Sequence, residues 1–176
     1  DKGKRGDRQD HVRKLLSSVC ESESSLVVNN NAAAVMLSIN EIAKGGEVIV
    51  SRGELVEIGG SFRIPDIIKA SGSTLREVGT TNRTHISDYF NAINNRTKLI
   101  LKVHTSNYVV KGFTKSIDLN ELVSLGKKKN IPVMVDWGSG SLLKRGINNL
   151  SLDIPINRLM SKNPDLITFS GDKLIG

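Results

Sequence analysis

The chain has 176 residues, of which 38% are hydrophobic and 24% are charged, a balance that suits one folded domain, or one domain with part of a neighbour. No apolar run approaches the ~20 residues that a membrane-spanning helix needs, and the opening stretch DKGKRGDRQD lacks the apolar segment of a secretory signal. The net charge of +7 is compatible with a lysine-rich proteome or with a polyanionic partner such as RNA, although aromatic residues make up only 4% and no RNA-binding motif of the stacking type is visible.

Strand-like and helix-like runs alternate along the chain. In chain order, we predict a short helix over 11–19; a short strand, a polar turn and a helix within 25–47; a strand over 48–54; a helix over 62–72; a strand over 74–80; a helix over 86–96; a strand over 98–107; a helix over 118–130; and strands over 131–141 and 164–173. This alternation predicts an α/β fold with three layers, α/β/α, in which helices cover both faces of a mostly parallel sheet.

Several helix ends are predicted from residues with capping chemistry. Pro65 lies near the start of one helix, and Ser87 is the predicted N-cap of the next. Asp118 lies near the start of the helix over 118–130, whose last turn carries lysines, so both ends match the helix dipole.

Polar residues collect where the predicted strands end. The stretches concerned are NNNAAA, SRGE, HTSNY, DWGSGS and SGDK. Because ligands of open α/β sheets bind at the carboxyl ends of the strands, these five strand ends predict one shared pocket.

The stretch NNNAAA joins a polar turn to a helix start. Small alanines there let backbone N–H groups meet an anion, with help from the helix dipole. An ordinary N-cap by Asn31 explains the same residues. The stretch is not a P-loop, because the sequence GxxxxGK[ST] is absent.

Asp136 follows directly on the apolar run IPVMV, and a buried acid at a strand end needs a partner. It would bind a metal, cap a helix or turn, or pair with a cationic ring nitrogen. A metal is disfavoured, because the three histidines are scattered and no HxxH or CxxC spacing exists.

Lys173 follows a predicted buried strand, beside Asp172 and behind Ser170. Alone, such a residue is most simply a solvated loop lysine, whereas in a partly desolvated pocket its amine can form a Schiff base. An anion-binding helix start, a strand-end Asp and a Ser-Gly-x-Lys in this order are typical of pyridoxal phosphate (PLP) sites, in which the Asp holds the ring nitrogen protonated and the Lys holds the aldehyde.

Other candidates have weaker signals. Arg52 and Arg83 lie at a strand end or in a loop and suit carboxylate or phosphate binding, while surface ion pairs explain them and Arg63 equally well. His104 would stack on a ring or lie in the core as a satisfied histidine.

Six segments resemble the family of bacterial selenocysteine synthases, the L-seryl-tRNA(Sec) selenium transferases. They cover most of 26–176 and are NNNAAAVMLSIN, EVIVSRGELVEIGGSFRIPDII, EVGTTNRTHISDY, LKVHTSNYVVKGFT, PVMVDWGSGSL and DLITFSGDKLIG. The resemblance implies the large domain of the aspartate aminotransferase fold (PLP fold type I), incomplete at its C-terminal end, with residues 1–25 as a lead-in or a remnant of an N-terminal domain and 26–176 as a partial PLP-binding domain.

The resemblance also implies roles for individual residues. It implies Lys173 as the Schiff-base lysine, Asp136 as the partner of the pyridine nitrogen, and Asp172 beside the position of the selenium donor. The remaining roles are phosphate contacts (Asn31, Ala32, Ala33, Ser170), a donor to the ring hydroxyl (Asn107) and binding of anionic substrate groups (Arg52, Arg83).

The implied reaction converts seryl-tRNA(Sec) to selenocysteinyl-tRNA(Sec) with selenophosphate, through a PLP-bound aminoacrylyl intermediate. The implied protein is a cytoplasmic homo-oligomer based on dimers, up to a larger ring, and the single Cys20 fits a reducing compartment.

Because the family is longer on both sides, we expect this fragment to be inactive alone, with an unpaired edge or gap in its sheet. Trp137 stands where we expect a smaller aliphatic residue. Two alternatives stay open: a related PLP-dependent lyase acting on a small amino or sugar acid, and a non-catalytic truncated remnant.

Overall fold

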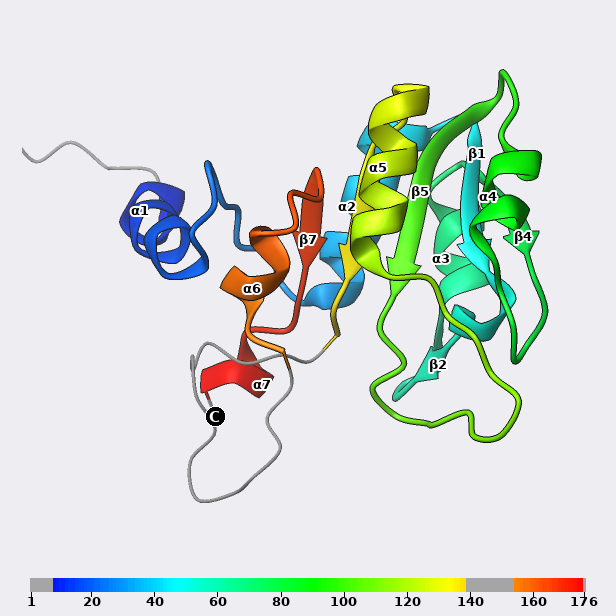
Figure 1. The fold of residues 1–176 in the computed structure, drawn as a ribbon. Helices are drawn as coiled ribbons and strands as arrows, with labels where there is room; N and C mark the ends of the chain where they lie inside the picture. Colours follow the sequence, from blue (N-terminus) through cyan, green and yellow to red (C-terminus); the bar gives the residue numbers. More distant parts are fainter. Residues whose placement is uncertain (1–7, 139–153, 176) are drawn as a thin grey trace, which may run out of the picture.

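The computed structural model describes residues 8–138 and 154–175, and its centre is a five-stranded parallel sheet (Figure 1). The strand order is β4-β1-β5-β6-β7. The strands are β1 (Glu47–Ser51), β4 (Thr74–Val78), β5 (Thr97–Val103), β6 (Val133–Asp136) and β7 (Leu166–Thr168). Because all the paired strands run the same way, their carboxyl ends meet at one edge, as the sequence predicts.

Helices cover both faces of the sheet, which confirms the predicted three-layer α/β/α fold. On one face lie α2 (Asn31–Ala43) and α3 (Ile64–Ala70), and on the other lie α4 (Ile86–Ala92) and α5 (Leu119–Lys129). Two further helices, α1 (Arg8–Cys20) and α6 (Ile156–Met160), pack against each other beside β7. Each core layer therefore lies between one helix layer and the sheet.

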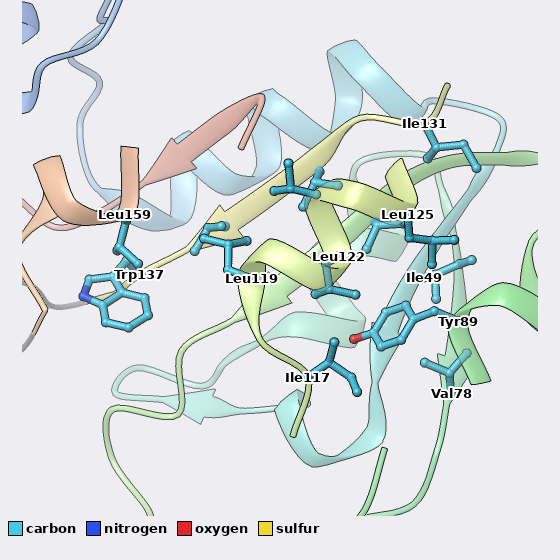
Figure 2. Close-up of a cluster of buried hydrophobic side chains, with 14 of the residues drawn as sticks. Ile49, Val78, Tyr89, Ile117, Leu119, Leu122, Leu125, Ile131, Trp137 and Leu159 are labelled. Carbon is cyan, nitrogen blue, oxygen red and sulfur yellow. The ribbon is translucent and has the colours of Figure 1, made fainter. Parts of the chain in front are cut away.

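The strands alternate their side chains between the two core layers. In β1, Val48 and Val50 pack with α2 and α3, while Ile49 between them packs with α4 and α5. The core layer between the sheet and helices α4 and α5 includes the buried side chains of Tyr89, Leu122 and Trp137 (Figure 2). Both faces of the inner strands β1, β5 and β6 are largely buried, which is why these strands contain hydrophobic runs, whereas the edge strand β4 carries exposed Arg76 and Glu77.

Local chemistry fixes the ends of α5. The carboxylate of Asp118 accepts from the backbone N–H of Asn120 at 2.8 Å, and its other oxygen pairs with Lys162 Nζ at 3.0 Å. Asn130 closes the helix in the left-handed region at φ 54°, after three lysines in the last turn. The predicted start and end of this helix are confirmed.

Two sequence predictions are wrong: the strand before α2, and Ser87 as the N-cap of α4. No strand precedes α2, because residues 25–28 form no ladder with the described strands and Leu26 and Val27 are exposed. Ser87 is not the N-cap of α4: the helix begins at Ile86, and Asp88 Oδ2 accepts from the backbone N–H of His85 at 2.8 Å. The N-cap is His85, and its capping box with the carboxylate at the third helical position replaces the predicted serine cap.

Short elements were not predicted. They are a 3₁₀ turn (Arg52–Glu54), the two-stranded antiparallel hairpin of β2 (Glu57–Ile58) and β3 (Phe62–Arg63), α6, and α7 (Asp172–Ile175). Each is too short to show a periodic pattern in sequence. The other predicted helices and strands are present; positions 139–141 of one predicted strand and positions 1–7 of the predicted N-terminal lead-in lie outside the described residues.

A search of the described residues finds no helix with the length and apolar character needed to span a membrane.

The cap of α5 gives a testable pH dependence. The Asn120 N–H and Lys162 lower the pKa of Asp118, so its stabilising effect is complete above the usual carboxyl range and is lost as pH falls through the lowered pKa. We expect Asp118→Ala to lower the free energy of unfolding by about 1 kcal/mol at neutral pH. Asp118→Asn should keep most of this stability, because asparagine also caps. Urea denaturation at several pH values measures this, and equal stability of the two variants would contradict it.

Candidate functional site

The buried carboxylate of Asp136 is the centre of the candidate site. It lies at the carboxyl end of β6 and is 1% exposed. Its Oδ1 accepts from Asn31 Nδ2 at 2.8 Å and from Thr168 Oγ1 at 3.0 Å. The first turn of α2 and the end of β7 are therefore joined to β6 through one oxygen atom.

The second oxygen, Asp136 Oδ2, is buried and has no hydrogen-bond partner among the described residues. Burial raises the pKa of Asp136, and the hydrogen bonds from Asn31 and Thr168 oppose this shift. A buried acceptor without a donor is unfavourable, so the site is suited to a ligand that brings an N–H, above all a positively charged one. The protonated nitrogen of a pyridine ring has this chemistry, and the residues present therefore fit PLP.

The start of α2 differs from the sequence interpretation in one respect. Asn30, not Asn31, is the N-cap, and its Oδ1 accepts from the backbone N–H of Ala33 at 2.8 Å. Asn31 is thereby free of the capping role and turns its amide to Asp136. An anion bound at Ala33 would have to share or replace the bond from Asn30, whereas the half-buried Ala32 has no such competing contact among the described hydrogen bonds.

The segment after β7 carries the predicted lysine. Ser170 Oγ bonds to Asp172 Oδ1 at 2.5 Å, and this contact lowers the pKa of Asp172. Both Asp172 and Lys173 are exposed in the four-residue helix α7. The described residues therefore do not form the partly desolvated pocket that the sequence interpretation places around Lys173.

The three arginines have partners other than Asp136. Arg52 Nε lies 3.0 Å from Glu77 Oε2, and its Nη1 donates to Gly79 O at 2.5 Å. Arg63 pairs with Glu57 at 2.7 Å across the β2-β3 hairpin. The Arg83 guanidinium lies 3.8 Å from the centroid of the Phe113 ring.

His104 and Trp137 form a flat stack next to Asp136. Their ring centroids are 3.9 Å apart at an interplanar angle of 8°, and Trp137 is 7% exposed. The backbone N–H of His104 donates to Asp136 O at 2.9 Å, which places the stack beside the carboxylate. Trp137 fits where a smaller residue was expected because the flat imidazole packs on its ring. Asn107 donates to Glu57 O at 2.8 Å, at the β2-β3 hairpin.

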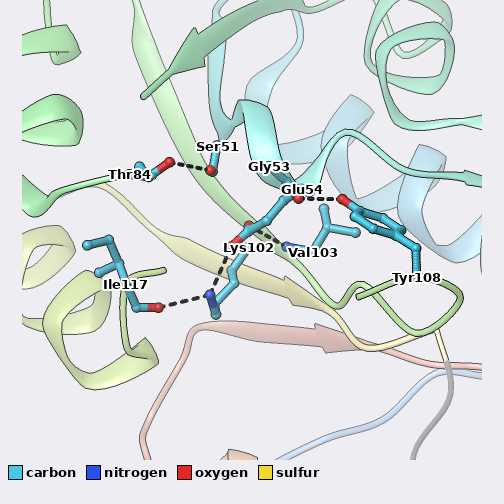
Figure 3. A network of polar contacts seen from close by, with 8 residues as sticks. All are labelled: Ser51, Gly53, Glu54, Thr84, Lys102, Val103, Tyr108 and Ile117. Atoms are coloured by element: carbon cyan, nitrogen blue, oxygen red, sulfur yellow. Dashed lines mark hydrogen bonds and ion pairs between the residues drawn. The ribbon is translucent and has the colours of Figure 1, made fainter. Parts of the chain in front are cut away.

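Sequence reasoning missed a buried ion pair between Glu54 and Lys102 (Figure 3). Lys102 Nζ lies 2.9 Å from Glu54 Oε1 and donates to Ile117 O at 2.9 Å, while Glu54 Oε2 accepts from the Val103 N–H at 2.9 Å. The side chains are 17% and 9% exposed. A lysine inside the apolar run LILKV was the available signal, because a buried charge in a strand requires a partner.

Comparison with known proteins finds relatives over the whole length of this chain. A family model described as "SelA: L-seryl-tRNA selenium transferase" matches residues 1–176. The L-seryl-tRNA(Sec) selenium transferase of Nitratidesulfovibrio vulgaris is 56% identical over 176 residues, which are 100% of this chain and 38% of that protein. The chain thus spans little more than a third of the length of this relative.

Solved structures share the fold. A D-glucosaminate-6-phosphate ammonia-lyase superposes with a TM-score of 0.76 at 19% identity, over 97% of this chain and 47% of that one. An E. coli GDP-4-keto-6-deoxy-D-mannose-3-dehydratase with bound hydrated PLP superposes with a TM-score of 0.55 at 18% identity, over 82% of this chain and 36% of that one. The fold is therefore that of PLP fold-type I enzymes, as the sequence predicts.

The ion pair makes a prediction about stability. Lys102→Met should lower the free energy of unfolding by about 3–5 kcal/mol, because it leaves Glu54 charged and buried. The double variant Glu54→Gln with Lys102→Met should recover much of the loss. Chemical denaturation of the three proteins measures this, and a double variant as unstable as the single one would contradict it.

Asp136 makes a second prediction. Its pKa is raised in the folded state, so the stability that the neutral acid contributes is lost as pH rises through that pKa. Asp136→Asn removes the buried charge, and we expect the cofactor-free variant to gain on the order of 1 kcal/mol at neutral pH and nothing in acid. Thermal melts across pH measure the difference; a variant that is less stable at every pH would disprove this account.

Proposed function

The chain belongs to the L-seryl-tRNA selenium transferase family, and from this premise we propose that it forms the cofactor-binding part of an enzyme that converts seryl-tRNA(Sec) to selenocysteinyl-tRNA(Sec). PLP is the proposed cofactor and selenophosphate the proposed selenium donor. The observation that supports this most directly is the buried Asp136, held by Asn31 and Thr168 with Oδ2 lacking a donor.

The residues of this chain would hold PLP through three kinds of contact. Asp136 would accept from the ring nitrogen, and Asn107 would donate to the ring hydroxyl. The phosphate would lie at the start of α2, near Asn31, Ala32 and Ala33, with Ser170 from the end of β7. When bound, PLP supplies an electron sink for negative charge at the α-carbon of the substrate.

The chemical work of the chain falls to the segment after β7. The Lys173 amine would accept the α-proton of the seryl group at Nζ, acting as general base. Asp172, on the same helix and ionised with support from Ser170, lies next to Lys173 where the selenium donor would approach. The seryl hydroxyl would leave as water, selenium of selenophosphate would add at the β-carbon, and a proton would return to the α-carbon. Hydrolysis of the Se–P bond would release phosphate and complete the exchange, provided that bulk water is kept from the β-carbon until selenium has added.

The arginines would recognise anionic groups of the substrates. Arg52 is about half exposed and already oriented by Glu77 and Gly79, so its guanidinium is held in place at the carboxyl end of β1. An ion pair of this exposure is weak, and an anion of the substrate would compete with Glu77 for it. We therefore assign Arg52 to substrate binding and leave Arg83, which is stacked on Phe113, as the weaker candidate for that role.

A second candidate is a PLP-dependent lyase that acts on a small amino or sugar acid. It is favoured by the superposition on the D-glucosaminate-6-phosphate ammonia-lyase over 97% of the chain. The two candidates share the cofactor contacts and differ in the need for RNA, so binding of tRNA separates them. We further propose that the protein is a cytoplasmic homo-oligomer built on dimers. The remaining alternative, a non-catalytic truncated remnant, would be indicated if the chain took up no PLP.

Absorption spectroscopy with added PLP tests the cofactor site. We expect a near-visible absorption band that is lost in Lys173→Ala and kept in Lys69→Ala, a matched change of an exposed lysine in the last turn of α3. Asp136→Asn should weaken the affinity for PLP about tenfold or more, because a charge-assisted hydrogen bond is removed.

Borohydride reduction followed by peptide mass analysis then identifies the modified lysine. Label on Lys173 alone supports the assignment. An equal band in Lys173→Ala, or label spread over surface lysines, would refute it.

A further inference from the structure

Two neighbouring asparagines lie at the start of α2, and their side chains have different partners. Asn30 is the N-cap, and its Oδ1 accepts from the backbone N–H of Ala33. Asn31 is the first helical residue, and its Nδ2 donates to Asp136 Oδ1 at 2.8 Å. Because Asn30 caps the helix, the amide of Asn31 is available to bond to an acid 105 positions farther along the chain.

The orientation of the Asn31 amide follows from the acid beside it. Its Nδ2 faces Asp136, since an amide oxygen turned to an ionised carboxylate would place two acceptors together. Its Oδ1 is buried and has no hydrogen-bond partner among the described residues. The oxygens of a phosphate dianion accept hydrogen bonds and would give Oδ1 no donor. The Asn31 side chain is therefore directed at Asp136, whereas its backbone N–H, which no described hydrogen bond uses, could still contact a phosphate.

Asn31 also determines which oxygen of Asp136 can carry a proton. Thr168 Oγ1 and the backbone N–H of Gly138 donate to the same Oδ1, at 3.0 and 3.5 Å. The Gly138 contact is long, and a hydroxyl such as that of Thr168 can turn and accept instead of donating. The Asn31 Nδ2 can only donate. It therefore keeps Oδ1 free of a proton, and protonation of Asp136 is confined to Oδ2.

The same hydrogen bond favours the ionised form of Asp136. A hydrogen bond to a charged carboxylate is about twice as strong as one to the neutral acid. Burial raises the pKa of Asp136, and the Asn31 side chain is the largest of the contacts that oppose this shift. The ionised acid offers Oδ2 as an acceptor for a cationic N–H, whereas the neutral acid has its own proton there.

Among the described residues, other charges have little effect on this carboxylate. His104, after the end of β5, favours the ionised form and is the smallest of the influences on the pKa of Asp136. The other ionisable side chains of α2, β5 and the segment 165–173 are exposed, apart from one that is paired with Glu54. They are Glu41, Lys98, Lys102 (the paired one), Asp165, Asp172 and Lys173.

We propose that Asn31 is a positioning residue for the cofactor: its side chain keeps Asp136 ionised, with Oδ2 left as the acceptor for the cationic ring nitrogen. This inference rests on the proposed function, which supplies PLP. The backbone of Asn31 begins the helix at which the phosphate would lie, so one residue connects the two ends of the cofactor. A protonated ring takes up negative charge from the substrate more readily, so Asn31 acts on the reaction through Asp136.

Thermal melts of the whole protein across pH, first without PLP, test the effect of Asn31 on Asp136. In acid, Asp136 is neutral, and Asn31→Ala should melt only slightly below the unchanged protein. As pH rises through the raised pKa of Asp136, the variant lacks the donor to the ionised carboxylate, and its loss of stability should become about twice as large.

The matched control is Asn40→Ala, in the same helix. Asn40 Nδ2 donates to Ser71 O, also at 2.8 Å, and no titrating group takes part in that bond. This variant should melt below the unchanged protein by an amount that does not change with pH.

A second variant, Asn31→Asp, keeps the size of the side chain and replaces its donor. In acid, a proton on one carboxyl group can bridge to Asp136, and toward neutral pH the two like charges repel. Asn31→Asp should therefore match the unchanged protein in acid and lose stability more steeply than Asn31→Ala as pH rises. It tests the proposal independently of whether Asn31→Ala folds.

Titration with PLP, followed by the absorption band, tests the connection to the cofactor. Asn31→Ala should bind PLP about tenfold more weakly than the unchanged protein at neutral pH. The factor should shrink as pH rises, because Asp136 then ionises in both proteins. Asn40→Ala should bind PLP like the unchanged protein.

Two results would overturn the proposal: stability losses of Asn31→Ala and Asn31→Asp that do not change with pH, or a PLP affinity of Asn31→Ala that is unchanged or weakened by one constant factor at every pH. Either result would leave Asn31 with a structural role alone. A pH-dependent loss of stability without a Lys173-dependent band would refute the proposed function. A Lys173-dependent band with effects of Asn31→Ala that do not change with pH would refute the role of Asn31 alone.

Discussion

The candidate site depends on the hydrogen bonds that converge on Asp136. Asn31 and Thr168 lie 105 and 32 positions away in sequence, and both donate to Oδ1. A carboxylate at the end of a buried strand is unfavourable without donors, so these bonds determine how α2 and β7 meet the edge of β6. They also use one oxygen completely and leave the other, Oδ2, for a ligand. The same contacts therefore join α2 and β7 to β6 and leave the oxygen that we propose as the acceptor for a cationic ring nitrogen.

The Glu54–Lys102 ion pair also joins segments that are distant in sequence, near the carboxyl ends of β1 and β5. It joins the turn after β1 to the end of β5 and to Ile117, two residues before α5. All the hydrogen-bonding groups in this network have partners, which is the condition under which a buried ion pair is tolerated. The network bonds the residues on both sides of the loop over 104–116, Val103 and Ile117, and so determines where the loop begins and ends.

The sequence was sufficient for features set by local chemistry. Apolar strands, the acid at the end of β6, and the position of Asp118 near the start of α5 were predicted because each depends on neighbouring residues alone. Contacts between distant residues could not be predicted. Neither the choice of Asn30 over Asn31 as the N-cap nor the stack of Arg83 on Phe113 is visible before the chain is folded. Ser87 is not the cap because α4 begins at Ile86, which puts Ser87 at the second helical position, and His85 forms the capping box with Asp88.

The two ends of the candidate site differ in burial and hydrogen bonding, which agrees with the proposed chemistry. The partner of a ring nitrogen must keep one protonation state and one direction, and Asp136 is buried, doubly bonded and part of the sheet. A lysine that alternates between holding the cofactor and moving a proton must change position during each cycle. Lys173 is exposed on a helix of four residues, beyond the last paired position of β7. If Lys173 were buried and hydrogen-bonded like Asp136, it could hold the cofactor, but it could not change position to move a proton. The contrast between a fixed acid and an accessible amine is therefore expected of a site in which the cofactor is bound at one end and exchanged at the other.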